Sequence, residues 1–240
     1  MNMDGQGYQV KAFVYADDVL DDIERSLSPE RFARYLNATQ GNRKAAVHLY
    51  TWNTAVSAAF YGPLQGLEIA LRNAMHRHLS AVYGTDWYDN PAAGLDQGAT
   101  KQIADAKNKL KGKYTVDAPH IVASLSFGFW VALLGRGGKF DQSESKANYE
   151  MTLWRPALRA AFTTEAPLKR RDAHEPLDYL RTLRNRIAHH EPIFERHLEK
   201  DHDGILQITG WLSPSSRDWI AHHSRVPALL RQGRHAPTYF

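Results

Sequence analysis

Between Pro63 and Tyr83, apolar side chains recur every three or four residues, and no other feature of the chain restricts its fold as strongly. This repeat is typical of an amphipathic helix, and the predicted inward face consists of Leu64, Leu67, Leu71, Met75, Leu79 and Val82. Gly62 and Pro63 predict a break between this helix and an earlier helical stretch, residues 43–60. Such a helix needs other helices to cover its apolar face.

The helical period returns through most of the 240 residues, and the sequence shows no convincing strand series and no glycine-rich phosphate loop. A hydrophobic fraction of 43% is sufficient for a sizeable core. Serine followed by proline, at Ser28 and again at Ser213, is typical of a capped helix start. We therefore predict an all-α fold, an irregular helical bundle. It forms one domain over residues 1–240, with a core of about 17–231 and short mobile termini.

The segment from Leu180 to Phe194, LRTLRNRIAHHEPIF, combines a buried helical stripe with a high density of polar side chains. Pro192 disfavours the α conformation at the residue before it, so the helix is predicted to end near His190 or Glu191. The stripe consists of Leu177, Leu180, Leu183 and Ile187, and the other faces carry Arg181, Arg184, Asn185, Arg186, His189 and His190.

Arginine and histidine together are chemically sufficient to cleave RNA without a metal ion. Histidine titrates near neutral pH and can act as a general acid or base, a role worth about 10²–10⁴ in rate. Arginine offers a fixed charge and a planar fork to phosphate oxygens. At about 100° per residue, Arg184 and His189 lie roughly 140° apart around an ideal helix, whereas Asn185 and His189 share a face. Arg184 must therefore reach round, the last turn must unwind, or a second copy must supply the partner groups.

The run from Arg184 to His189 fits the motif of the HEPN ribonuclease superfamily, in which a few residues separate an arginine from a histidine. The wider sequence resembles the abortive-infection (Abi-like) branch of that superfamily, and the likeness covers about residues 28–230. The similar segments are SPERFARYLNAT, LYTWNTAVSAAFYGPLQGLEIALRNAMHRHL, HIVASLSFGFWVALL and ILQITGWLSPSSRDWIAHHSRVPALL.

This resemblance implies a HEPN-like helical bundle with the activity of a metal-independent endoribonuclease. It implies attack by the RNA 2′-hydroxyl, which leaves a 2′,3′-cyclic phosphate and a 5′-hydroxyl. The implied catalytic residues are Arg184, Asn185 and His189, and the motifs of two protomers meet in one composite site of a homodimer. Such a protein acts as a toxin or an antiviral defence effector, with RNA as substrate and a protein or RNA antidote as a possible further partner. No cofactor and no metal are expected.

Glu68 and Arg72 are a second group of candidate residues, because Leu71-Arg72-Asn73 repeats the Leu183-Arg184-Asn185 tripeptide. Glu68 and Arg72 lie four residues apart and can form an ion pair along their own helix. They can instead orient the candidate active-site helix or contact RNA. The sequence leaves these interpretations open.

Lys169, Arg170 and Arg171 form a third group, within a predicted basic loop over residues 163–174 that leads into the candidate active-site helix. A basic triplet at this place suits the electrostatic capture of RNA, although an ordinary solvated loop fits it nearly as well. Arg181, Arg186 and His190 complete the predicted RNA-binding or supporting set.

Other interpretations of the motif compete with catalysis. The chain can be a catalytically silent RNA-binding helical module, but a pure phosphate binder does not need His189. The arginines can also form a solvated helix face, with the histidines merely favouring the helix dipole. A metal site at His189, His190 and Glu191 is disfavoured, because adjacent helical residues point apart and the HExxH arrangement is missing.

The absence of cysteine excludes disulfides and thiolate zinc sites, which suits a reducing compartment, and a cytoplasmic protein is expected. The 30 lysines and arginines against 26 acidic residues give a net charge of +4, too small to indicate nucleic-acid binding by itself. The longest apolar run, residues 121–135, is too short to span a bilayer. It belongs to a predicted core helix from Pro119 to about Leu134, and no membrane span is expected.

Overall fold

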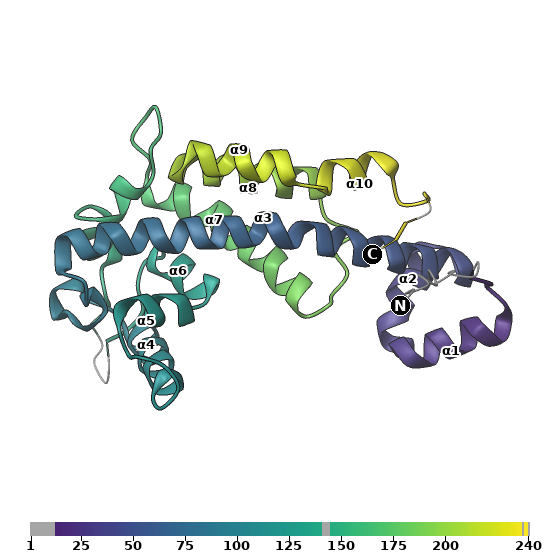
Figure 1. Cartoon of the computed structure of the whole chain (residues 1–240), viewed down its shortest axis with the longest axis horizontal. Helices are drawn as coiled ribbons and strands as arrows, with labels where there is room; N and C mark the ends of the chain where they lie inside the picture. Colours follow the sequence, from purple (N-terminus) through teal and green to yellow (C-terminus); the bar gives the residue numbers. More distant parts are fainter. Residues whose placement is uncertain (1–12, 141–144, 237, 240) are drawn as a thin grey trace, which may run out of the picture. The chain divides into compact units, whose positions relative to one another are not determined.

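A computed structural model describes residues 13–140, 145–236 and 238–239 of the chain. Within these residues the protein is helical and contains no β-strand, so the predicted all-α class is confirmed (Figure 1). An isolated antiparallel bridge joins Lys139 to Lys146. Residues 1–6, which were predicted to be mobile, lie outside the described residues.

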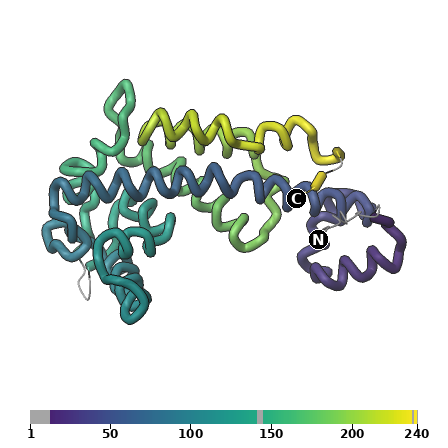
Figure 2. Tube along the Cα trace, in the orientation of Figure 1, coloured from purple at the N-terminus to yellow at the C-terminus, as the bar shows by residue number. Residues whose placement is uncertain are grey.

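The helices follow one another along the chain, and short 3-10 or π-helical turns, η1 to η4, connect some of them (Figures 1 and 2). The α-helices are α1 (Asp17–Leu27), α2 (Pro29–Ala38), α3 (Arg43–Tyr83), α4 (Gln97–Leu110), α5 (Ala118–Ser124), α6 (Phe127–Leu133), α7 (Arg170–Ala188), α8 (Leu198–Leu212), α9 (Pro214–His223) and α10 (Val226–Gln232). The turns are η1 (Trp87–Asp89), η2 (Pro91–Ala93), η3 (Glu150–Trp154) and η4 (Leu158–Ala161).

The chain divides into two compact units, and the first comprises Met1–Ala55 and Gln232–Phe240. In this unit the Ser28 hydroxyl accepts a hydrogen bond from the Arg31 amide, as expected for a helix cap. The guanidinium of Arg234 lies over the Trp52 ring. A single domain across the whole chain stays a prediction.

The second unit, Val56–Arg231, contains the candidate site and has an aromatic centre. The rings of Trp87, Phe129 and Trp130 contact one another and are buried. The apolar segment before Leu134 therefore lies in the core, as predicted. It forms two helices instead of one. Helix α5 ends at Ser124, Leu125 is extended, and the Ser126 hydroxyl caps the start of α6 by accepting from the Phe129 amide.

Helix α3 continues through Pro63, so the predicted break at this residue is wrong. An internal proline removes one backbone hydrogen bond and costs about 3 kcal/mol. Burial of the residues on both sides offsets this cost, since Phe60 and Leu67 have no exposed surface and Leu64 is buried. Val82, in the last turn, is exposed although it belongs to the predicted inward face.

Helices α7, α8 and α9 pack against one another in chain order. Helix α7 contacts α6 and α8, and α8 and α9 lie side by side (Figures 1 and 2). The Ser213 hydroxyl caps α9 by accepting from the Ser216 amide at 3.2 Å, as the serine-proline pair predicts. In the described part of the chain, no helix combines the length and the apolar character needed to cross a membrane.

Candidate functional site

Helix α7 presents the motif because one of its faces is fixed in the core. The predicted stripe residues Leu177, Leu180 and Leu183 are buried, whereas Ile187 is only half-buried. Pro176 lies inside the helix, within its second turn. Since the stripe locks the rotation of the helix about its axis, the directions of the motif side chains are also set.

The end of α7 is a hydrogen-bonded turn that holds both histidines outside the helix. The helix ends at Ala188, two residues before the predicted end, and His189 follows as its cap. His190 has a left-handed backbone with φ of 56°, and its amide donates to the Ile187 carbonyl at 3.1 Å. The Glu191 amide donates to the Arg186 carbonyl at 2.8 Å, which completes a Schellman motif. The side chains of His189 and His190 are exposed.

Three of the predicted residues meet at a cavity between α3 and α7. Arg184 Nε lies 3.7 Å from Glu68 Oε2, and Arg72 lines the same cavity of about 380 Å³. This distance is that of an ion pair and is longer than a hydrogen bond. The other lining residues are Tyr61, Leu64, Gln65, Ile69, Ile187 and Ala188. Two guanidinium groups, one carboxylate and an apolar wall therefore surround a space large enough for part of a nucleotide.

Arg184 has a carboxylate at ion-pair distance, whereas no ion pair is formed by Arg72 among the described residues. Its Nε atom is buried and has no hydrogen-bond partner among the described residues. The ion pair along α3 that the sequence allowed between Glu68 and Arg72 is not formed, because Glu68 faces Arg184 instead. An arginine with a buried, unpartnered donor at a cavity is suited to an anionic ligand.

The remaining polar residues of this segment do not line the cavity: Arg181, Asn185, Arg186, His189 and His190 all lie outside it. Arg181 Nε donates to Asp178 Oδ1 at 2.8 Å, and Arg186 Nη1 donates to the Pro192 carbonyl at 3.4 Å. The Asn185 carbonyl accepts the His189 amide at 2.9 Å. Arg186 thus supports the turn that carries the histidines.

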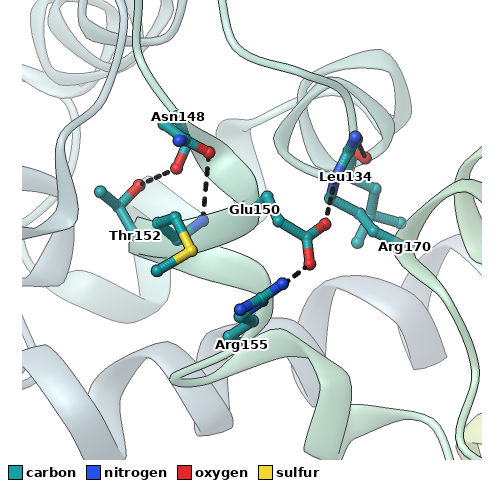
Figure 3. Close-up of polar contacts among 7 residues, drawn as sticks. Leu134, Asn148, Glu150, Thr152, Arg155 and Arg170 are labelled. Atoms are coloured by element: carbon teal, nitrogen blue, oxygen red, sulfur yellow. Dashed lines mark hydrogen bonds and ion pairs between the residues drawn. The ribbon is translucent and has the colours of Figure 1, made fainter.

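The basic triplet lies at the opposite end of α7. Residues 170–174 are the first turns of the helix and not part of a loop, contrary to the sequence prediction. Arg170 Nε donates to Glu150 Oε2 at 3.1 Å, and its Nη1 donates to the Leu134 carbonyl at 2.6 Å (Figure 3). Arg171 pairs with Glu175 along the helix, and Lys169 occupies the N-cap position.

His76 and His78, which follow the repeated tripeptide on α3, are partly buried and lie away from the candidate site. The pKa of His76 is lowered by burial, and its Nδ1 accepts a hydrogen bond from Trp87 Nε1 at 3.0 Å. Burial and the nearby Arg77 lower the pKa of His78. Neither histidine lines the cavity at Arg184. On α7, burial also lowers the pKa of His174.

A buried ion pair that the sequence did not predict fixes the segment after the motif. Arg196 donates to both carboxylate oxygens of Asp201, at 2.9 Å each, and its guanidinium stacks on the Tyr179 ring of α7. Tyr61 and Gln65 were not among the predicted site residues either, although their spacing with Glu68 and Arg72 places all four on one helix face. That spacing was a signal the sequence offered. No comparable local pattern in the sequence predicts the pair between Arg196 and Asp201.

Comparisons with protein-family models, curated proteins and solved structures found no match to this chain. The resemblance to the HEPN superfamily therefore rests on the motifs of the sequence. Among the described residues, no group of three or more histidine, aspartate or glutamate side chains is placed to hold a metal ion. Independence from metal stays a prediction. The arrangement at the end of α7 offers cationic groups for a phosphate and exposed imidazoles for proton transfer.

Proposed function

We propose that the chain is a metal-independent endoribonuclease of the HEPN type, with its site at the C-terminal end of α7. The meeting of Glu68 and Arg72 with Arg184 at one cavity carries this proposal. The sequence singles out these three residues from two distant segments for roles in RNA binding or catalysis. RNA cleavage requires charge stabilisation, which these arginines can supply, and proton transfer, which the exposed His189 after the end of the same helix can supply.

In the proposed reaction, the 2′-oxygen of a ribose forms a bond to the adjacent phosphorus, and the bond from phosphorus to the 5′-oxygen breaks. A neutral histidine takes the proton of the 2′-hydroxyl, and a protonated histidine gives a proton to the leaving 5′-oxygen. Arg184 and Arg72 stabilise the charge on the crowded phosphate. Glu68 holds Arg184 through a long, partly exposed contact, which a phosphate can replace.

The proposal includes a homodimer. Neither motif histidine, His189 or His190, lines the cavity at Arg184. Acid and base roles at one phosphate call for at least two titrating groups. Association about a twofold axis is the commonest symmetry of homo-oligomers and doubles the set of arginines and histidines. The resemblance in sequence also supports a role as a toxin or antiviral defence effector restrained by a protein or RNA antidote, and the lack of cysteine suits the cytoplasm.

The main experiment compares the cleavage of end-labelled RNA by wild type, His189→Ala and Arg184→Ala. We expect each substitution to lower the rate by about 10²-fold or more. His222→Ala is the matched control, because His222 is also exposed near a helix end but lies outside the motif. A His189→Ala protein that melts cooperatively and still cleaves at the wild-type rate would contradict the catalytic assignment.

Metal independence is tested by the same assay in EDTA. We expect the rate to be unchanged and the products to carry a 2′,3′-cyclic phosphate and a 5′-hydroxyl. Loss of cleavage in EDTA, with full recovery on adding one particular divalent metal, would overturn the proposal. In that case His190 and Glu191 would again be candidate ligands of the metal ion.

The oligomeric state tests the composite site. An active protein that sediments as a monomer at the assay concentration would exclude a site built from two copies. Recovery of activity on mixing Arg184→Ala with His189→Ala, under conditions in which subunits exchange, would support it.

A second candidate function is RNA binding without cleavage. The position of His189 outside the cavity favours this alternative, because a phosphate-binding site at Arg72 and Arg184 is complete without it. Wild-type protein that binds RNA tightly but leaves it intact, with equal affinity after His189→Ala, would establish the binding module instead.

A further inference from the structure

The first turn of α7 carries charges of the wrong sign for a helix start. Lys169 stands at the N-cap position and makes no side-chain hydrogen bond to the first turn, where serine, threonine, aspartate or asparagine is usual. Arg170 and Arg171 follow, and Asp172 is the acidic residue of that turn. Because the N-terminal end of a helix bears partial positive charge, these cations oppose the helix dipole. An anion bound here relieves that repulsion.

A cavity lies directly at this helix start, and we call it the basic cavity. Its volume is about 550 Å³. Five cationic side chains and one carboxylate contribute to its wall, together with the buried Trp154. The charged lining residues are Glu150, Arg155, Arg159, Lys169, Arg170 and Arg171.

The single carboxylate of the basic cavity is already engaged. Glu150 Oε1 accepts from Arg155 Nε and its Oε2 accepts from Arg170 Nε, each at 3.1 Å (Figure 3). Glu150 therefore pairs with two guanidinium groups and compensates only one of their two charges. Arg159 and Lys169 are exposed and have no carboxylate at ion-pair distance among the described residues. Arg171 is paired with Glu175, which does not line the cavity, and with this pair counted the cavity still keeps a surplus of positive charge.

We propose that the basic cavity binds phosphate groups of the RNA backbone, as a second contact besides the site at the end of α7. The proposal rests on the proposed function for the identity of its ligand. Guanidinium forks and a helix start both favour phosphate oxygens, and permanent charges make such binding independent of a particular base. Fourteen residues separate Arg170 from Arg184, which is about 21 Å along the helix axis. At about 3.4 Å per stacked nucleotide this corresponds to roughly six nucleotides.

The experiment measures binding of a fluorescent 2′-O-methyl RNA of about 12 nucleotides, which cannot be cleaved by 2′-hydroxyl attack and is long enough to reach both contacts. The variant is Arg159→Gln with Lys169→Gln. The matched control is Arg225→Gln with Lys101→Gln, which removes one exposed arginine and one exposed lysine elsewhere. Thermal melting checks that both variants are folded, and anisotropy gives Kd between 50 and 200 mM KCl.

Two phosphate contacts contribute about 1.4 to the slope of log K against log salt for a single strand. We therefore expect the variant to lower this slope by about that amount and to weaken binding roughly 10- to 30-fold at 0.1 M salt. We expect the control to stay within about twofold of wild type. An equal loss in both variants, or no loss in Arg159→Gln with Lys169→Gln, would overturn the inference.

Two further outcomes separate this inference from the proposed function. Loss of RNA binding in the variant, in a protein that never cleaves RNA, supports the basic cavity and contradicts the nuclease. Wild-type cleavage combined with unchanged binding in the variant contradicts the basic cavity and leaves the nuclease standing. Binding of inorganic phosphate or of vesicles containing acidic lipid, without any binding of RNA, would overturn the assignment to RNA.

Discussion

The ion pair between Arg196 and Asp201 is expected to be the most sensitive polar contact near the candidate site. The Asp201 side chain has no exposed surface, and that of Arg196 is 10% exposed. Arg196 lies in the segment after α7. It binds Asp201 of α8 and stacks on Tyr179 of α7, so it ties this segment to both helices. We consider Asp201→Asn, which keeps the size of the side chain and removes its charge.

The expected loss follows from the geometry. Hydrogen bonds to charged groups contribute about 1.5–3 kcal/mol each, and the asparagine keeps one acceptor and turns a donor toward the guanidinium. At least one of the two bonds is lost, and the arginine is left buried without its counter-charge, for which losses of about 3–5 kcal/mol are typical. We therefore expect Asp201→Asn to lower the free energy of unfolding by about 2–4 kcal/mol.

Urea unfolding followed by circular dichroism measures this loss. Asp218→Asn is the matched control, because Asp218 pairs with Arg217 on the surface, and we expect it to have little effect. A double variant, Arg196→Met with Asp201→Leu, should recover much of the loss, since no uncompensated charge remains. A loss below about 1 kcal/mol in Asp201→Asn, with an unchanged m value, would refute the reasoning.

Three further predictions concern the turn, a cap and pH. His190→Val should lower the free energy of unfolding by roughly 1–2 kcal/mol in urea titrations, because a branched side chain does not fit its left-handed backbone, whereas His190→Gly should be tolerated. Ser126→Ala should cost about 1 kcal/mol by removing the cap of α6, and Ser124→Ala should cost clearly less, since its hydroxyl caps no amide. Burial lowers the pKa of His202, so its contribution is present above the unfolded pKa of about 6.5 and is lost as pH falls through the lowered folded pKa. His202→Gln should therefore lose less stability between pH 7.5 and 5.5 than wild type, and an equal loss in both would contradict this.

The sequence by itself determined the features that depend on neighbouring residues. The serine caps before Pro29 and Pro214, the buried stripe of α7 and the approximate end of that helix before Pro192 were all predicted. Caps, apolar spacing and proline act over a few residues, so their effects can be read along the chain. The all-α class follows from the same signals.

Only the tertiary structure decided which distant groups meet. The sequence allowed Glu68 to pair with Arg72 or to orient the candidate active-site helix, and the structure places it beside Arg184 of that helix. The same dependence on packing explains why Arg170 is held by Glu150 and why α3 continues through Pro63. In each case a local preference competes with burial and with partners far along the chain. The conformation adopted depends on the sum of these free energies, and this sum cannot be read from any one segment of the sequence.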